Sequence, residues 1–184
     1  MKDYVRAQAN AMKKLNDLTL PGEIVVFGST YMSNFPIYEL INRYTLENAV
    51  YNRSIKGLTI AEAAELLDDC IFNVRPSKLF ISLGEEDTSN PNAISEYSLL
   101  VSKTSEKLPN CTLYLICLSE DSEFAKNFNA NIKRIANGKN IKAIELVSQG
   151  SSDIGLYKAQ FKQLSCFFRR RPITMSDAFH SAII

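Results

Sequence analysis

Short, almost continuous apolar runs alternate along this chain with longer segments of helical periodicity, and this alternation most limits the folds open to it. The apolar runs lie at residues 24–27, 49–51, 79–83, 113–118 and 141–147. Strands that are apolar on both faces are typical of parallel sheets, because right-handed crossovers place helices over both sides. We therefore expect an α/β fold with three layers, α/β/α, around a central, mostly parallel, five-stranded sheet.

The segments between these runs carry helix signals. Apolar residues recur at helical spacing over residues 5–15. Thr59 and Glu62 form a capping box that predicts the start of another helix. Further helices are expected at about residues 93–108 and 122–136.

Length and charge exclude some classes of protein. The 184 residues, 46% of them hydrophobic, suffice for one sizeable core, so we expect a single domain over residues 1–184. Lys and Arg number 21 and Asp and Glu 20, so no global field favours nucleic acid or an anionic membrane as a partner. The basic run at residues 169–171 stands without a second cluster and is interpreted as a solvated turn rather than a phosphate contact.

Cysteine usage and hydropathy suggest a compartment. No stretch is apolar enough for a signal peptide or a membrane span. The four cysteines, which are Cys70, Cys111, Cys117 and Cys166, show no CxxC spacing and lie among apolar residues. Buried reduced thiols in a cytoplasmic protein explain this pattern, and a disulfide or a zinc site is the alternative.

Ligands of parallel α/β sheets bind beyond the carboxyl ends of the strands, so residues that follow each run are candidates for chemistry. Gly28 permits a tight turn after the first run, and two hydroxyls follow at Ser29 and Thr30. Such a hydroxyl either acts as a nucleophile or caps the next helix. Gly57, in the loop after the second run, can offer a backbone N–H to an anion.

Two further groups are rich in ionisable side chains. Glu85, Glu86 and Asp87 follow the third run. They form either a solvated acidic turn or a cation site, which would indicate a metal-dependent phosphoryl or hydrolytic enzyme. The only histidine, His180, lies three residues after Asp177, a spacing that lets a carboxylate orient a general base; an ordinary surface histidine is the alternative.

Taken in order, residues 26–30, residues 52–57, residues 84–87 and the pair Asp177 and His180 resemble the four sequence blocks of the SGNH (GDSL-type) hydrolases. The resemblance covers most of the chain and implies the flavodoxin-like SGNH hydrolase fold. It also implies an esterase or acetylhydrolase without a cofactor, whose substrate is a small acyl ester or an acylated carbohydrate.

The resemblance implies a role for five residues. Thr30 takes the place of the nucleophilic serine, and Gly57 supplies a backbone N–H to the oxyanion hole. His180 is the general base, which Asp177 orients. Glu86 stands where the family has an asparagine whose side chain donates to the oxyanion.

Two of these positions depart from the family pattern. The extra methyl group of Thr30 crowds the approach of its oxygen to a carbonyl carbon. A carboxylate at Glu86 repels a developing oxyanion unless its surroundings keep it protonated, and losing one donor costs roughly 100- to 1000-fold in turnover. The sequence therefore leaves open a weak esterase and a non-catalytic relative that binds an acyl, carbohydrate or protein ligand.

The family continues into a helix after the histidine, whereas residues 181–184 alone follow it here. The N-terminal helix, or a second copy of the chain in a homo-oligomer, would then cover the surface left exposed. Phe167 and Phe168 are interpreted as core or subunit contacts.

Overall fold

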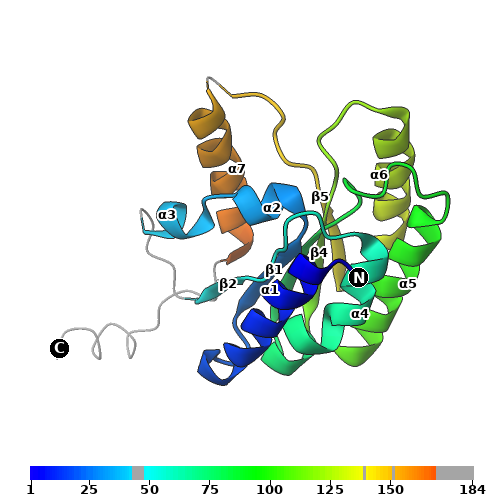
Figure 1. Cartoon of the computed structure of the whole chain (residues 1–184). Coiled ribbons are helices and arrows are strands. Elements are labelled where there is room, and N and C mark those ends of the chain that lie inside the picture. Colours follow the sequence, from blue (N-terminus) through cyan, green and yellow to red (C-terminus); the bar gives the residue numbers. More distant parts are fainter. Residues whose placement is uncertain (43–47, 139, 151, 169–184) are drawn as a thin grey trace.

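A central parallel sheet organises the computed structural model (Figure 1). The structure describes residues 1–42, 48–138, 140–150 and 152–168. The strands are β1 (Ile24–Gly28), β2 (Val50–Asn52), β3 (Lys78–Ser82), β4 (Thr112–Ile116) and β5 (Ile141–Ile144). All pairs are parallel in the order β2-β1-β3-β4-β5, which is the flavodoxin-like order. The predicted fold class is confirmed.

Both faces of the sheet are buried, which explains the continuous apolar runs. Val25 and Leu79 are register partners on neighbouring strands and belong to one apolar cluster. Val26 and Phe80, one residue further along each strand, belong to the cluster on the other face. Because successive side chains point to opposite faces, a strand covered on both sides needs an apolar residue at each position.

Helices form the two outer layers (Figure 1). One face carries α1 (Asp3–Lys14), α4 (Ile60–Cys70), α5 (Ala93–Lys107) and α6 (Glu123–Ile135). The other face carries α2 (Thr30–Asn34), α3 (Ile37–Ile41) and α7 (Asp153–Phe168). Short 3-10 turns follow α1 at Asn16–Leu18 and α4 at Phe72–Val74. The four helices expected from the sequence are all present, with ends within a few residues of the predicted ones.

Helix α7 was not predicted, and it alters the end of the fifth strand. Phe161, Leu164 and Phe168 recur at helical spacing and are buried against the sheet. The strand was expected to continue to Val147, but it ends at Ile144. The Val147 N–H donates to the Gln163 side chain of α7 instead of pairing with another strand. The interpretation of Phe168 as a core residue is confirmed.

The cysteines match the expectation at three positions out of four. Cys70, Cys111 and Cys117 are buried free thiols. Burial raises the pKa of Cys70 and Cys117 to about 11 and that of Cys111 to about 12. The expected burial of Cys166 was wrong, because this free thiol lies on the exposed side of α7.

Among the described helices, none combines the length and apolarity that a membrane span requires.

The capping box of α4 yields a prediction about stability. Thr59 Oγ1 accepts the Glu62 N–H, and the Glu62 carboxylate accepts the Thr59 N–H, both at 3.3 Å. Thr59→Ala removes one acceptor and should lower the free energy of unfolding by about 1 kcal/mol, measured by urea denaturation. Thr88→Ala, at an exposed threonine, is the control. An equal loss in the two variants would contradict the capping role.

Candidate active site

Thr30, Gly57 and Glu86 meet at one hydroxyl oxygen beyond the carboxyl ends of β1, β2 and β3. The Gly57 N–H donates to Thr30 Oγ1 at 2.9 Å. The Thr30 hydroxyl in turn donates to Glu86 Oε1 at 2.5 Å. Thr30 is half-buried, whereas Glu86 is exposed. The structure thus brings together three of the five residues that the resemblance singled out.

The other two residues, Asp177 and His180, lie outside the described residues. The basic run at residues 169–171 also lies outside them. The assignment of a general base and its orienting carboxylate therefore stays a prediction, and so does the interpretation of the basic run as a solvated turn.

Gly28 fixes the point at which the chain leaves β1. A Cβ atom at this position would lie 2.7 Å from the Ser82 carbonyl oxygen and 2.9 Å from the Met32 Cβ, so a larger residue would push these elements apart. The Ser29 N–H donates to the Ser82 carbonyl at 3.0 Å, which extends the pairing between β1 and β3 beyond the strand. Thr30 is thereby held at the edge of the sheet.

Ser29 does not cap the following helix, which was the alternative to a role at the site. It occupies the N-cap position of α2 without a side-chain capping bond. Its buried hydroxyl lies 3.5 Å from Glu86 Oε1 and also interacts with Glu85. The hydroxyls of Ser29 and Thr30 therefore both face the acidic loop after β3.

The loop after β2 presents its N–H through one unusual backbone conformation. The Asn52 side chain donates to the Met32 carbonyl and accepts the Ser54 N–H, each at 3.0 Å, which fastens the loop to α2. Gly57 has φ of 72°, a region that residues with a Cβ rarely adopt. This conformation directs the Gly57 N–H towards Thr30.

Helix α1 closes over the same loop, a contact that the sequence did not predict. Lys2 Nζ donates to the Gly57 carbonyl at 2.6 Å and forms an ion pair with Glu62 at 3.2 Å. The Tyr4 hydroxyl lies where a Cβ atom on Gly57 would project. No local sequence pattern reveals these contacts, because those of Lys2 join residues 55 and 60 positions apart in the sequence.

The three carboxylates after β3 serve separate partners. Glu85 accepts the Tyr31 N–H of α2 at 2.8 Å. Asp87 accepts the first N–H of α4 at 3.1 Å, and Glu86 accepts the Thr30 hydroxyl. Among the described residues, no group of three side chains could hold a metal ion. The three carboxylates are thus directed to different partners, and the alternative of a cation site stays a prediction.

Tyr31 links α2 to α7. Its hydroxyl donates to the side-chain oxygen of Gln160, which is buried and donates in turn to the Val147 carbonyl at 2.9 Å. Burial raises the pKa of Tyr31 to about 12. The helix that carries Thr30 is consequently held by Glu85 on one side and by α7 on the other.

Comparison with solved structures identifies this architecture. A candidate platelet activating factor from Streptococcus pneumonia aligns with a TM-score of 0.76 at 17% identity, over 90% of this chain and 93% of its own. A GDSL-like lipase from Bacteroides thetaiotaomicron gives 0.61 at 13% identity, over 85% and 97%. The chain has the SGNH hydrolase fold. A family 3 carbohydrate esterase from Clostridium thermocellum shares this fold, with a TM-score of 0.62 at 17% identity over 80% and 94%.

The likeness to SGNH hydrolases lies in the fold and not in overall sequence. No protein-family model matches the chain, and no curated protein matches it. Identities of this size show the fold alone.

A small hollow, of about 30 Å³, lies beside Glu85 and is lined also by Tyr31, Cys117 and Glu120. This is room for about one water molecule. Since these residues follow β1, β3 and β4, the hollow adjoins the candidate site.

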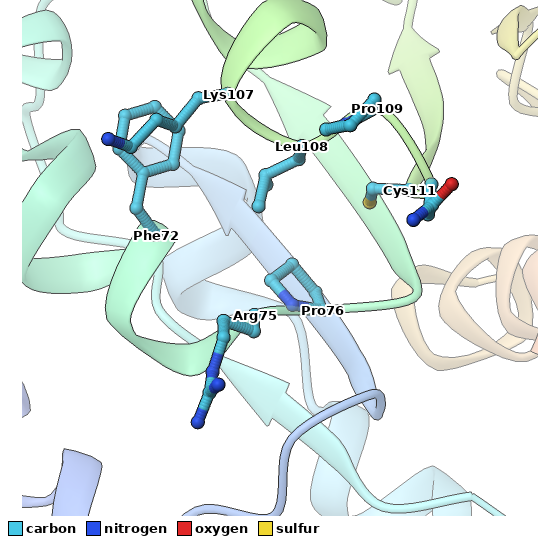
Figure 2. Close-up of a pocket in the computed structure, with 8 residues that line it drawn as sticks. Phe72, Arg75, Pro76, Lys107, Leu108, Pro109 and Cys111 are labelled. Carbon is cyan, nitrogen blue, oxygen red and sulfur yellow. The ribbon is translucent and has the colours of Figure 1, made fainter.

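Another hollow, of about 350 Å³, is mainly apolar (Figure 2). Phe72, Pro76, Leu108 and Cys111 line it. Pro76 and Cys111 precede β3 and β4, so the hollow opens at the amino ends of these strands. It lies at the opposite end of the strands from Thr30 and is not part of the candidate site.

A side chain at Gly57 should destabilise the fold in two ways, through the backbone conformation and through a clash with Tyr4. Gly57→Ala adds a methyl group at positive φ and against the Tyr4 hydroxyl, and should lower the free energy of unfolding by about 1–3 kcal/mol. Combining it with Tyr4→Phe removes the hydroxyl but leaves the backbone cost. Urea denaturation of the two single variants and the double variant measures both terms. Wild-type stability in Gly57→Ala would contradict the strained backbone.

The raised pKa of Glu85 predicts that the stability of the protein depends on pH. Burial raises its pKa above the ordinary 4.5, although the hydrogen bond from Tyr31 opposes the shift. The native state then binds this proton more tightly than the unfolded chain, so the contribution of Glu85 is full below the unfolded pKa and lost as pH rises through the folded pKa. Glu85→Gln keeps an acceptor for Tyr31 and should gain stability relative to wild type between about pH 4 and pH 7, measured by urea denaturation.

The control for this effect is Glu65→Gln, at an exposed carboxylate on α4. It should leave the shape of the stability curve against pH unchanged. A Glu85→Gln curve that runs parallel to that of the wild type would show that Glu85 does not titrate differently in the folded and unfolded states.

Proposed function

We propose that this protein hydrolyses small acyl esters, such as acetyl esters or acylated carbohydrates, with Thr30 as the nucleophile. The supporting observation is the position of the Thr30 hydroxyl at the carboxyl end of β1, in contact with the Gly57 N–H. SGNH-type hydrolases place their nucleophile directly after this strand. Solved structures with this fold include a carbohydrate esterase and a GDSL-like lipase.

In this proposal the reaction proceeds through an acyl-threonine. Thr30 Oγ1 attacks the ester carbonyl, and the oxyanion receives hydrogen bonds from the Gly57 N–H and the Thr30 N–H. To donate to the substrate, the Gly57 N–H must exchange its bond to Thr30 Oγ1 for one to the oxyanion. The resemblance gives His180 as the base and Asp177 as its orienting partner. We expect slow turnover, because the Thr30 methyl group hinders the attack.

A second candidate is a non-catalytic protein of SGNH fold that binds an acyl, carbohydrate or protein ligand. Two observations favour it. The Gly57 N–H already has an acceptor in Thr30 Oγ1, and Glu86 stands where the resemblance leads one to expect an oxyanion donor. A bound ligand would then use the surface around α1 and α2 without reacting.

The cytoplasm is the compartment in which we propose that this activity takes place. All four cysteines are free thiols, and Cys166 is exposed. An exposed thiol persists in reduced form most readily in a reducing compartment.

Hydrolysis of p-nitrophenyl acetate tests the proposed function. Thr30→Ala removes the nucleophile and should lower kcat/KM by roughly 1000-fold or more. Thr30→Ser removes only the methyl group and should react faster than the wild type. Thr88→Ala is the matched control at an exposed threonine. If Thr30→Ala is as active as the wild type, or if neither exceeds buffer, the esterase proposal fails and ligand binding becomes the better account.

A further inference from the structure

We infer that Glu86 is a catalytic residue that accepts the proton of the Thr30 hydroxyl as this oxygen attacks the ester. The inference rests on the proposed function, because it names the group that activates the same nucleophile, with Glu86 in place of the His180 that the resemblance gives as the base. It gives the carboxylate at this position a role opposite to that of the amide donor implied by the resemblance.

The polarity of the two hydrogen bonds at Thr30 supports this role. A hydroxyl has one proton, and the Thr30 proton is donated to Glu86 Oε1 at 2.5 Å. The Gly57 N–H approaches the same oxygen as a donor at 2.9 Å, so it cannot receive that proton. A general base has to lie within hydrogen-bond reach of the proton that it removes. Glu86 meets this condition without any rearrangement.

The neighbouring groups leave Glu86 available for proton transfer. Glu85 is directed to the Tyr31 N–H and Asp87 to α4, so neither carboxylate takes the Thr30 proton. In the part of the chain that the structure describes, no Lys or Arg forms an ion pair with Glu86. Glu86 is also exposed, so a substrate and a water molecule can reach it.

Proton transfer removes the electrostatic objection to a carboxylate at this position. A charged Glu86 would repel the oxyanion. Once it has taken the Thr30 proton, however, Glu86 is a neutral carboxylic acid with an O–H to donate. The repulsion is therefore relieved in the same step that creates the oxyanion.

Glu86 carries one proton through both halves of the proposed reaction. Thr30 Oγ1 bonds to the carbonyl carbon while its proton passes to Glu86, and the π electron pair moves to the carbonyl oxygen. When the intermediate collapses, the bond to the alcohol oxygen breaks and Glu86 returns the proton to that oxygen. Water then attacks the acyl-threonine with Glu86 again as acceptor, and the carboxylic acid leaves as Thr30 regains a proton.

Substitutions at Glu86 distinguish a proton acceptor from a charge that only repels the oxyanion. If Glu86 accepts the proton, Glu86→Gln and Glu86→Asn should each lower kcat/KM for p-nitrophenyl acetate by about 100- to 10,000-fold. If it only repels the oxyanion, the same amides should raise kcat/KM. Glu65→Gln removes an exposed carboxylate on α4, away from the candidate site, and should stay close to the wild type. Glu86→Asp should retain part of the activity.

Covalent labelling isolates the first step. A small fluorophosphonate should label Thr30 in the wild type, as detected by peptide mass spectrometry, and label Glu86→Gln far more slowly. Circular dichroism and urea denaturation establish that each variant is folded. Thr30-dependent hydrolysis that is unchanged or raised in Glu86→Gln, or equal labelling rates, would overturn this inference and leave the esterase proposal standing. No Thr30-dependent hydrolysis or labelling in any protein would overturn both.

Discussion

The pairing of β1 with its two neighbours is the constraint on which the site depends. β1 lies between β2 and β3, and the register that joins Gly28 to Ser82 brings the ends of the strands to one edge. Both faces of this strand are buried, so a shift of register by one residue would move each side chain into the opposite layer, against neighbours of a different shape. Thr30, Gly57 and Glu86 therefore meet because a dry core fixes the strands that precede them.

Polar contacts hold the loops that follow these strands. The loop with Gly57 is held by a hydrogen bond from Asn52, within the loop, to Met32 of α2. It is also held by a hydrogen bond from Lys2, the residue before α1, to the Gly57 carbonyl. The acidic loop after β3 is fastened by Glu85 and Asp87, which bind the first turns of α2 and α4. Each of these side chains accepts or donates a backbone bond, so hydrogen bonds hold the loops around Thr30 at several points. Such anchoring is the usual requirement for preorganised hydrogen-bond donors.

The chain has the SGNH hydrolase fold, while Thr30 and Glu86 differ from the residues that the resemblance leads one to expect at two strand ends. A threonine follows β1, and its hydroxyl already donates to the carboxylate that follows β3. Replacing an amide by a carboxylate turns a donor into an acceptor, which an oxyanion cannot use but a hydroxyl nucleophile can. The two departures from the resemblance are therefore joined by one hydrogen bond, between the Thr30 hydroxyl and Glu86.

The sequence by itself determined the class of fold, because continuous apolar runs between helical segments have few solutions other than a parallel sheet with helices on both faces. It also determined which residues follow the strands, including Thr30, Gly57 and Glu86. It did not predict α7, whose apolar stripe is interrupted by polar residues such as Gln160 that bind other parts of the chain. Nor could it predict the exposure of Cys166, which depends on that helix.

Only the tertiary structure decided how the polar side chains are paired. Three successive carboxylates read alike in a sequence, yet Glu85, Glu86 and Asp87 have three different partners. Their directions are set by a turn and by elements far away in the chain. Local patterns determine which segments are buried, because burial follows from apolar periodicity. The partner of a hydroxyl or carboxylate depends on distances between distant loops, and these exist only after the sheet has formed.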